Sequence, residues 1–417
     1  MARKSTRKVP QGRARSSTPI HPLTAIKQPS VSIARSKQQR KQEHFKRQRR
    51  RLAFAAQREK RSGWIETARD TQMIVLGDGK YITQRPSTHF SPSVASSPFQ
   101  CRMPVAIVNP QGNALPNVMQ SFYDIAPQIV ISQQGTTFYP HCSPDHANWR
   151  GYRASSPTCE SSTIRFVHKS TLTAARHLII ENTRYTRQFP NALPTSSMGV
   201  LSFASAKRPG GGFLHGGDEQ EETLTRSTSL VASLRAPQAK EFYRTHRKFL
   251  NADGAETMTM YDVDVDPALS GPSSTIAPYL INVLSSVPVN AAAIRQNYLI
   301  TSSDAHVFEE GIRNTMRDRM ARALRIFETR GDRALVLGAF GCGSSQNNVE
   351  MVAELWAELL VCGTREGRIG KEETEPAKFK GVFEVIVFAV PGKLFAPFQR
   401  AFEMKVLEME VILAASE

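Results

Sequence analysis

The sequence has few cysteines, and none of them belongs to a CxxC motif. The thiols of Cys101, Cys142, Cys159, Cys342 and Cys362 are odd in number and irregularly spaced, and no apolar leader is present. A secreted, disulfide-stapled domain would have an even set of closely spaced cysteines. We therefore expect reduced thiols and an intracellular protein.

A recognisable metal-binding pattern is also missing. His141, Cys142, His146 and Cys159 bring together the residue types that bind zinc, but their spacing fits no common ligand pattern and Pro144 interrupts them. We expect neither a metal nor another cofactor.

Long apolar runs without helix breakers are absent as well. Residues 267–294 carry no charge over a length that would span a bilayer, but they contain four prolines, several serines and Asn282. A spanning helix tolerates these poorly. We expect no membrane span.

Acidic residues are missing from the first 42 positions. Residues 1–61 hold 19 Lys and Arg against two Glu, which equals the net charge of +17 for the whole chain, so the remainder is neutral. This excludes a wholly basic protein that coats nucleic acid. Low apolar content and four prolines predict a disordered tail. The cluster at 41–51 is typical of a nuclear-localisation or polyanion-binding patch, with nucleic acid as a candidate partner, or of a solvated helix start. The tail favours the nucleus over the cytosol.

Beyond the tail, the pattern predicts a helical extension with a Ser/Pro-rich insertion at 62–158, and an α/β domain at 159–417. The expected strands are 163–168, 198–204, 259–265, 279–287, 333–339 and 382–390, and the expected helices are 61–76, 171–182, 220–234, 238–250, 305–329 and 347–362. Strands alternating with helices predict a three-layer α/β/α sandwich with a mixed sheet.

The helix expected at 305–329 has one apolar face. Helical spacing places six residues inward: Val307, Ile312, Met316, Met320, Leu324 and Phe327. We expect Arg313, Arg317, Arg322 and Arg325 to lie on a solvated face rather than in a nucleic-acid groove, because the domain is neutral.

Two glycine-rich loops follow expected strands. Residues 207–213 read KRPGGGF, and residues 338–345 read GAFGCGSS before a helix. Loops at the carboxyl ends of strands bind ligands in open α/β sheets, and backbone N–H groups before a helix suit a pyrophosphate. Neither loop is a clean GxGxxG or is followed by a phosphate-loop lysine. A glycine loop between a strand and a helix also occurs in dinucleotide-dependent oxidoreductases, so this class of enzyme is kept as an alternative.

An acidic run, Asp218–Glu222, follows the first loop, and seven residues separate Gly212 from Gln220. Glycosidic cleavage requires one group that holds a sugar hydroxyl and one that transfers a proton. The adjacent carboxylates of Glu221 and Glu222 are able to share these two roles. Carboxylates at a helix start are also ordinary caps.

These residues resemble the microbial-type poly(ADP-ribose) glycohydrolases, which are macrodomain proteins. VLSFASAKRPGGGFLHGGDEQEETLTRS (200–227) is similar to the three-glycine and Gln-Glu-Glu signature of that family. LGAFGCGSSQNNVEMVAELWAELL (337–360) resembles its diphosphate loop, and YLINVLSSVPVN (279–290) a preceding strand. The resemblance covers about 160–390, and 43–83 faintly as a helical extension.

The resemblance implies ADP-ribose lying across both loops, and release of ADP-ribose from poly(ADP-ribose) or ADP-ribosylated proteins without a metal. It implies Glu222 as the acid/base, Glu221 as the residue that holds a ribose hydroxyl, and Gln220 as support for the turn. The implied ligand-binding residues are Gln220, Gly210, Gly211, Gly212, Phe213, Ser202, Phe340, Gly341, Cys342, Gly343, Ser344 and Ser345.

Two positions depart from the family pattern. Relatives usually carry Asn at the position of Ser202, and an aromatic residue at the position of Ser345. These departures keep open a second hypothesis, a macrodomain that binds ADP-ribose with little or no turnover and has a polyanion-binding tail.

Overall fold

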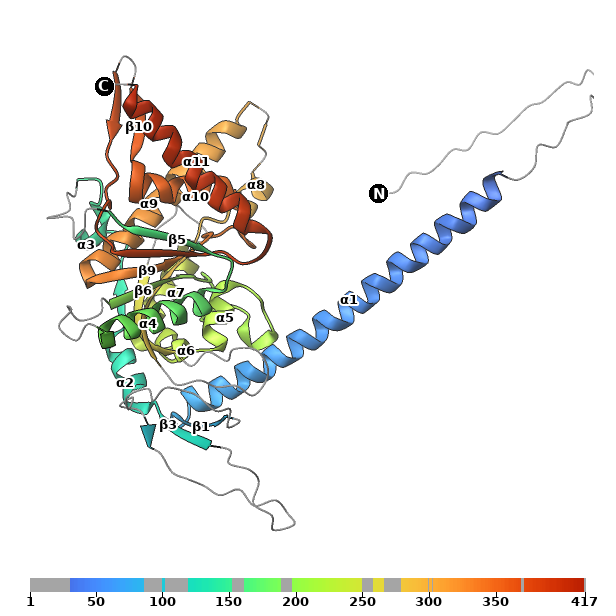
Figure 1. The fold of residues 1–417 in the computed structure, drawn as a ribbon, viewed down its shortest axis with the longest axis horizontal. Helices are drawn as coiled ribbons and strands as arrows, with labels where there is room; N and C mark the ends of the chain where they lie inside the picture. Colours follow the sequence, from blue (N-terminus) through green and yellow to red (C-terminus); the bar gives the residue numbers. More distant parts are fainter. Residues whose placement is uncertain are drawn as a thin grey trace, which may run out of the picture. The chain divides into compact units, whose positions relative to one another are not determined.

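The structure is a computed structural model of the 417-residue chain (Figure 1). It describes residues 31–85, 100–101, 119–151, 161–188, 197–249, 258–265, 279–298, 300–301, 303–368 and 371–415. The chain divides into two compact units, Met1–Gln57 and Arg58–Glu417. The Ser/Pro-rich part of the extension predicted at 62–158, residues 84–104, lies almost entirely outside the described residues.

A mixed sheet forms the centre of the second unit, with strand order β4-β7-β8-β6-β9-β12-β5. Its strands are β4 (Thr137–Tyr139), β7 (Met258–Val265), β8 (Tyr279–Ser286), β6 (Ser197–Phe203), β9 (Asp332–Leu337), β12 (Val385–Ala389) and β5 (Thr163–Val167). The strands from β8 to β5 pair in parallel, whereas β7 pairs antiparallel with both β8 and β4. The predicted α/β fold with a mixed sheet is confirmed.

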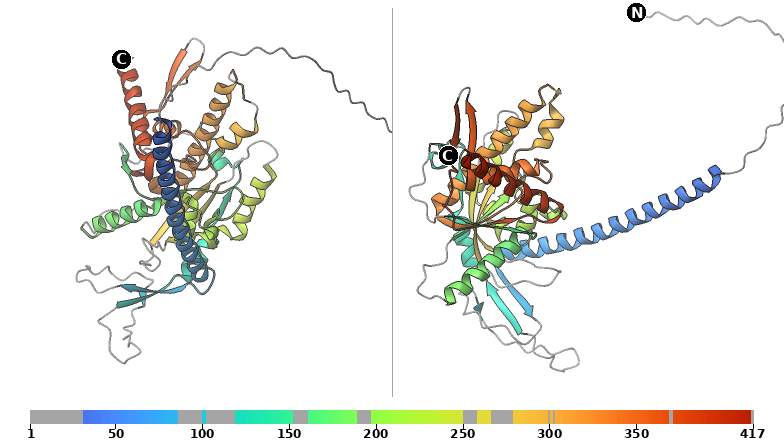
Figure 2. Two further views of the ribbon diagram at one scale, coloured as in Figure 1. Left: turned by 90° about the vertical axis from the view of Figure 1, so that its right-hand side faces the viewer. Right: turned by 45° about the horizontal axis from the view of Figure 1, so that its top comes forward.

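Helices cover both faces of this sheet (Figures 1 and 2). Alternate side chains of β6 enter two different apolar clusters: Val200 packs in one and Leu201 in the other. The first cluster includes residues of α4 (Thr171–Gln188), α5 (Gln220–Arg226), α6 (Leu230–Leu234) and α7 (Pro237–Phe249), and the second includes residues of α9 (Ala305–Arg330), α10 (Val349–Ala357) and α11 (Phe395–Ala414). Burial on both faces explains why the parallel strands are nearly continuously apolar.

A smaller sheet with order β1-β3-β2 lies on the N-terminal side of the chain, and its strands are β1 (Lys80–Arg85), β3 (Met119–Asp124) and β2 (Gln100–Cys101). Tyr81 and Tyr123 of this sheet pack with Ala68 and Val75 of helix α1 (Val31–Val75) and with Phe213. The remaining elements are α2 (Ala126–Gly135), α3 (Pro144–Ala147), α8 (Ala291–Asn297), the hairpin β10 (Thr364–Arg368) and β11 (Lys371–Glu375), the short 3-10 turns η1 (Phe213–His215) and η3 (Gly392–Leu394), and the π-helical η2 (Glu358–Cys362).

The tail prediction is wrong over 31–61, which is helical rather than disordered. All four prolines of the tail precede Val31, and no proline or glycine occurs between that residue and Gly63. Arg, Lys, Gln, Glu and Ala, which dominate this stretch, are strong helix formers. Residues 1–30 lie outside the described residues.

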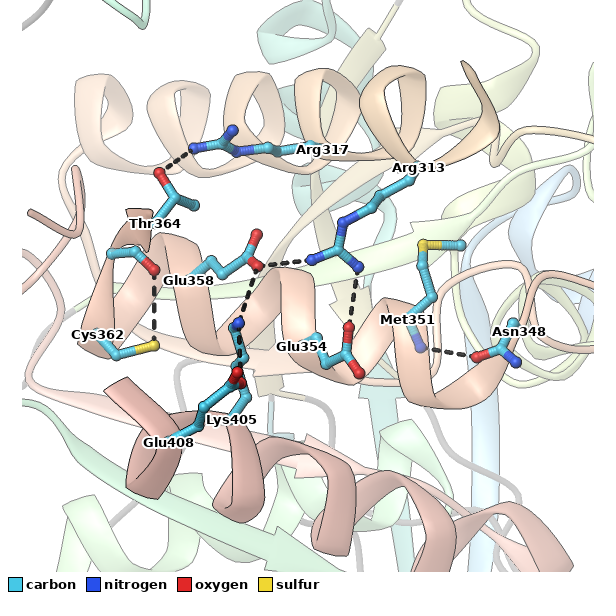
Figure 3. A network of polar contacts seen from close by, with 11 residues as sticks. Arg313, Arg317, Asn348, Met351, Glu354, Glu358, Cys362, Thr364, Lys405 and Glu408 are labelled. Carbon is cyan, nitrogen blue, oxygen red and sulfur yellow. Dashed lines mark hydrogen bonds and ion pairs between the residues drawn. The ribbon is translucent and has the colours of Figure 1, made fainter. Parts of the chain in front are cut away.

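The arginines of α9 are not a solvated face, which corrects the prediction. Figure 3 shows how Arg313 and Arg317 turn toward the neighbouring elements. Arg313 contacts Glu354 at 2.9 Å and the buried Glu358 at 2.6 Å, and Arg317 donates to Thr364. Arg322 is buried against Asp318, and Arg325 pairs with Glu328. Periodicity identifies the apolar residues of a helix, but it does not show that Arg313 will meet carboxylates of neighbouring elements or that Arg322 and Arg325 will pair within α9.

Five of the six apolar residues predicted to face inward on α9 are buried, and Val307 is exposed. Val307 lies in the first turn of the helix, where a face that is buried farther along the helix remains open to solvent. The predicted helix at 220–234 is two helices, α5 and α6, separated by Ser227–Ser229. Serines favour such breaks because their hydroxyls compete for backbone hydrogen bonds, and Thr228 Oγ1 accepts one from Leu230 N.

Cys142, Cys342 and Cys362 are free thiols, whereas Cys101 and Cys159 have no described side chain. Within the described ranges, no group of three or more His, Cys, Asp and Glu side chains is arranged to hold a metal ion. The described part of the chain also contains no helix long and apolar enough to cross a membrane.

Candidate active site

The two predicted glycine loops follow β6 and β9, which are adjacent parallel strands. Their carboxyl ends therefore meet at one edge of the sheet, where open α/β folds bind ligands. Phe203 is the last residue of β6, and Phe340 lies in the second loop. Their rings meet edge to face with their centroids 5.3 Å apart. Asn347 Nδ2 donates to Gly341 O within that loop and to Val289 O after β8. The sheet and these contacts bring the loops together.

Gln220 fastens the start of α5 to the end of β6. Its Oε1 accepts a hydrogen bond from Phe203 N at 2.9 Å, and its Nε2 donates to Leu201 O at 2.8 Å and to Thr171 Oγ1 at 3.2 Å. The side chain thereby takes the place of a neighbouring strand for the last residues of β6. Its amide is fully engaged by protein groups, which agrees with the predicted supporting role rather than with direct ligand contact.

Glu221 lies beneath the first loop and is 2% exposed. Its Oε2 accepts from Ser205 N at 2.7 Å and its Oε1 from Gly210 N at 3.2 Å. Burial raises the pKa of Glu221 to about 8, while the two backbone N–H groups act in the opposite direction and the Glu222 charge adds to the rise. The carboxyl group therefore fixes the path of the loop from its underside.

We expect the stability of the protein to fall with rising pH because of Glu221. Its pKa is raised from 4.5 in the unfolded chain to about 8 in the fold, so the stabilising contribution is complete below about pH 4.5 and is lost as the pH rises through 8. Urea unfolding near pH 5 and pH 8.5 should show a loss of roughly 1–4 kcal/mol between them in the wild type. In Glu221→Gln, which cannot ionise, this part of the loss should disappear. An identical pH dependence in both proteins would contradict the assignment.

Glu222 is half-buried and faces the glycines of the first loop. Its Oε1 accepts from Gly212 N at 2.6 Å and its Oε2 from Glu219 N at 2.8 Å. A Cβ atom on Gly211 would lie 3.0 Å from this side chain, and one on Gly212 2.9 Å from its Oε1. Gly211 also has φ +61°, a conformation that glycine adopts without strain. The glycines of the motif thus let the backbone close around one carboxylate.

Gly217 is a site residue that sequence reasoning missed. A Cβ atom on Gly217 would lie 2.1 Å from Glu222 Oε2. Cβ atoms on the other described glycines would lie farther from this carboxylate. Gly217 O accepts a hydrogen bond from Arg226 Nη1 at 2.8 Å, and the Arg226 guanidinium lies 4.9 Å from the centre of the Trp64 ring. Trp64 of α1 therefore braces, through Arg226, the residue that confines Glu222. The pair of glycines at 216–217 was the only signal in the sequence.

The second loop presents polar groups at its tip. Gly343 and Ser344 are exposed, while Cys342 and Ser345 are half-buried. Burial raises the pKa of the Cys342 thiol to about 12, with a smaller contribution from Glu350, so the thiol stays protonated. Ser345 O accepts from Ala292 N, which ties the loop to α8.

Five residues predicted to bind ligand are buried in this structure: Ser202, Gly210, Phe213, Phe340 and Gly341. Phe213 packs with α1 and the small sheet, and Phe340 belongs to the core beneath the second loop. Ser202 is 0% exposed, and its Oγ has no hydrogen-bond partner among the described residues. Their aromatic and hydroxyl groups line the base of the loops here, and a ligand role for them stays a prediction.

The arrangement supplies the parts that a glycosidic cleavage needs. Glu222 is a carboxylate whose position is fixed by two backbone N–H groups, and Glu221 is a second, protonatable carboxyl group behind it. Gly343 and Ser344 of the second loop are exposed at the same edge of the sheet. An acid/base group beside an anion-binding loop suits an anionic sugar substrate.

Comparison with known proteins agrees with this geometry. Residues 115–262 match the family model "Microbial-type PARG, catalytic domain". The structure of poly(ADP-ribose) glycohydrolase from Thermomonospora curvata is similar to this chain, with 27% sequence identity and a TM-score of 0.57. The match covers 84% of this chain and 99% of that enzyme's chain. The same enzyme bound to the inhibitor ADP-HPD gives a TM-score of 0.54. The enzyme from Deinococcus radiodurans in complex with ADP-ribose is 26% identical with a TM-score of 0.51, covering 67% of this chain and 98% of its own. No curated protein sequence matches the chain.

Proposed function

From the membership of this chain in the microbial-type poly(ADP-ribose) glycohydrolase family, we infer that it hydrolyses poly(ADP-ribose) and releases ADP-ribose. The scissile bond is the ribose–ribose O-glycosidic bond, and the fold is a macrodomain with ADP-ribose lying across the loops after β6 and β9. The observation that carries this proposal is the confinement of Glu222 by Gly211, Gly212 and Gly217 at the edge of the sheet.

In the proposed mechanism, Glu222 moves the proton. As the glycosidic bond breaks, its carboxyl group protonates the leaving ribose oxygen, and positive charge develops on the remaining sugar as an oxocarbenium-like centre. The same group, now a carboxylate, accepts a proton from the water that attacks this centre. The N–H groups of Gly212 and Glu219 hold the carboxylate in one orientation throughout.

Glu221 acts behind the loop. Because it accepts the N–H groups of Ser205 and Gly210, it fixes the backbone that faces the ribose in the proposed complex. We propose that the same carboxyl group also holds a ribose hydroxyl once the ligand is bound. The amides of Gly341 and Gly343 and the hydroxyl of Ser344 are the proposed donors for the diphosphate.

The test is the identity of the product. We expect the purified chain, incubated with poly(ADP-ribose) in the presence of a metal chelator, to release ADP-ribose as the main product, separated by anion-exchange chromatography. Release of AMP or phosphoribosyl-AMP would instead indicate cleavage of the diphosphate and would contradict the proposed bond.

A binding module without turnover is the second candidate, and Ser345 is the observation that favours it, because a small side chain stands where relatives usually have an aromatic residue. Saturable binding of ADP-ribose without release of product from the polymer would support this candidate. Gain of hydrolysis in Ser345→Phe would then assign the missing activity to this position.

We also propose a polyanion, such as nucleic acid or the polymer itself, as the partner of the basic N-terminal segment. Every described side chain from Gln42 to Ser62 is exposed, and most of its charges are positive. Deletion of residues 1–57, which form the first unit, should weaken binding to duplex DNA and remove most of its steep salt dependence. ADP-ribose affinity should not change. Unaltered DNA binding would contradict the assignment, and lost ADP-ribose affinity would place the segment in the site.

A further inference from the structure

The carboxylate of Glu219 lies between the two loops of the site. Burial and the Glu222 charge raise the pKa of Glu219, while the backbone N–H and the hydroxyl of the neighbouring Ser344 act in the opposite direction. A Cβ atom on Gly343 would lie 2.7 Å from Glu219 Oε2, so the carboxylate rests directly against the backbone of the second loop. The same side chain accepts Glu222 N as the cap of α5. One carboxylate therefore joins the start of α5 to the loop after β9.

The Glu219 carboxylate lies beside the hydrogen-bond donors of the second loop that a bound anion would use. Gly343 and Ser344 are exposed, so a ligand reaches the N–H and hydroxyl of Ser344 from solvent. Backbone amides and hydroxyls donate hydrogen bonds to carboxylate oxygens and to phosphate oxygens alike. In the ligand-free chain an acidic side chain of the protein itself lies against this loop, and that side chain carries the same sign of charge as a diphosphate.

We propose that Glu219 is an internal competitor for the diphosphate of the ligand, and that its carboxylate leaves Ser344 when the diphosphate binds. This inference rests on the proposed function, because it requires the diphosphate to lie against the loop after β9. Glu219 thereby sets the affinity for ADP-ribose without touching the bond that is cleaved. It acts as a specificity-determining residue that disfavours anionic ligands too weakly bound to displace it.

The substitution Glu219→Gln separates competition from capping. Glutamine keeps the length of the side chain and an oxygen that caps α5, but it has no charge and forms weaker hydrogen bonds to Ser344. Because Glu219 is exposed, its repulsion of a bound diphosphate is partly screened by water and salt. We expect the affinity for ADP-ribose to rise by roughly three- to tenfold, the range for one charge contact near a protein surface.

The control is Asp218→Asn, which removes the same charge from the neighbouring exposed residue. Isothermal titration of the full chain with ADP-ribose should show tighter binding for Glu219→Gln and a change below about twofold for Asp218→Asn. Adenosine, which lacks the diphosphate, should bind all three proteins equally. An equal gain in ADP-ribose affinity in both variants would overturn the proposal, because removal of any nearby negative charge would then explain it. An unchanged or weaker affinity in Glu219→Gln would also overturn the proposal.

Hydrogen exchange of the free proteins tests the contact independently of any ligand. Amides of residues 341–346 should exchange faster in Glu219→Gln than in the wild type or Asp218→Asn. Equal exchange in all three proteins would overturn the proposal, as would failure of all three to bind ADP-ribose. The proposed function is judged separately, because it fails only if the wild-type chain releases no ADP-ribose from the polymer.

Discussion

Replacement of Glu222 by glutamine is expected to lower the rate of poly(ADP-ribose) hydrolysis by roughly 10²–10⁴-fold, the usual contribution of a general acid/base group. Glutamine has the size of glutamate but neither donates nor accepts a catalytic proton. The affinity for ADP-ribose should stay within a few-fold of the wild type, since the loops that surround Glu222 supply the binding groups. Steady-state assays of product release and titration with ADP-ribose measure the two effects.

This variant loses one of two backbone hydrogen bonds, because glutamine has a single acceptor oxygen where Glu222 accepts from both Gly212 and Glu219. We expect a loss of unfolding free energy of about 1 kcal/mol, which leaves the protein folded. Asp218→Asn is the matched control for removal of a nearby charge and should retain full hydrolysis. Equal rates for wild type and Glu222→Gln would show that Glu222 does not transfer the proton.

Gly217→Ala is expected to reduce hydrolysis by roughly 10- to 100-fold, because a shift of about 1 Å in a catalytic group has effects of this size. The added methyl carbon would lie 2.1 Å from Glu222 Oε2 and 2.2 Å from its Cδ. The carboxylate is the end of a flexible side chain, so it moves while the backbone stays. The substitution therefore displaces the catalytic group without removing it. Product release and the thermal unfolding midpoint should be measured together.

Gly311→Ala is the control for this substitution. Gly311 lies in α9, and a Cβ atom there has no atom within 4 Å. Alanine in a helix is more stable than glycine by about 1 kcal/mol, so this variant should be fully active and slightly more stable. If Gly217→Ala retained wild-type hydrolysis, confinement by this glycine would not position Glu222. If both its activity and its fold were lost, the effect would be structural.

The sequence predicted the strands and helices that carry the site because each has a strong local pattern. The apolar runs of β6 and β9 and the glycine loops after them lie where expected, and adjacency of the two strands brings the loops together. The alternative prediction for the acidic run, that its carboxylates cap a helix, also holds, because Glu219 and Glu222 form a reciprocal cap at α5. A cap and a proton-transfer group are therefore not exclusive, since the cap orients Glu222.

Contacts between distant segments explain what the sequence did not predict. The brace from Trp64 through Arg226 to Gly217 depends on where α1 packs, and no local pattern encodes it. The contact of Glu219 with Ser344 likewise joins two loops across the sheet edge. The paired arginines of α9 have a polar sequence pattern that is indistinguishable from a solvated face until the partner elements are placed.

The structure of Glu222→Gln with ADP-ribose bound is the most direct test that the two loops form one catalytic site. We predict the diphosphate against Gly341–Ser344, with the Glu219 side chain displaced from Ser344. The terminal ribose should lie over Gly211 and Gly212, with its anomeric oxygen within hydrogen-bond distance of the residue-222 side chain. A ribose bound away from residue 222, or a diphosphate held by other elements, would contradict the account.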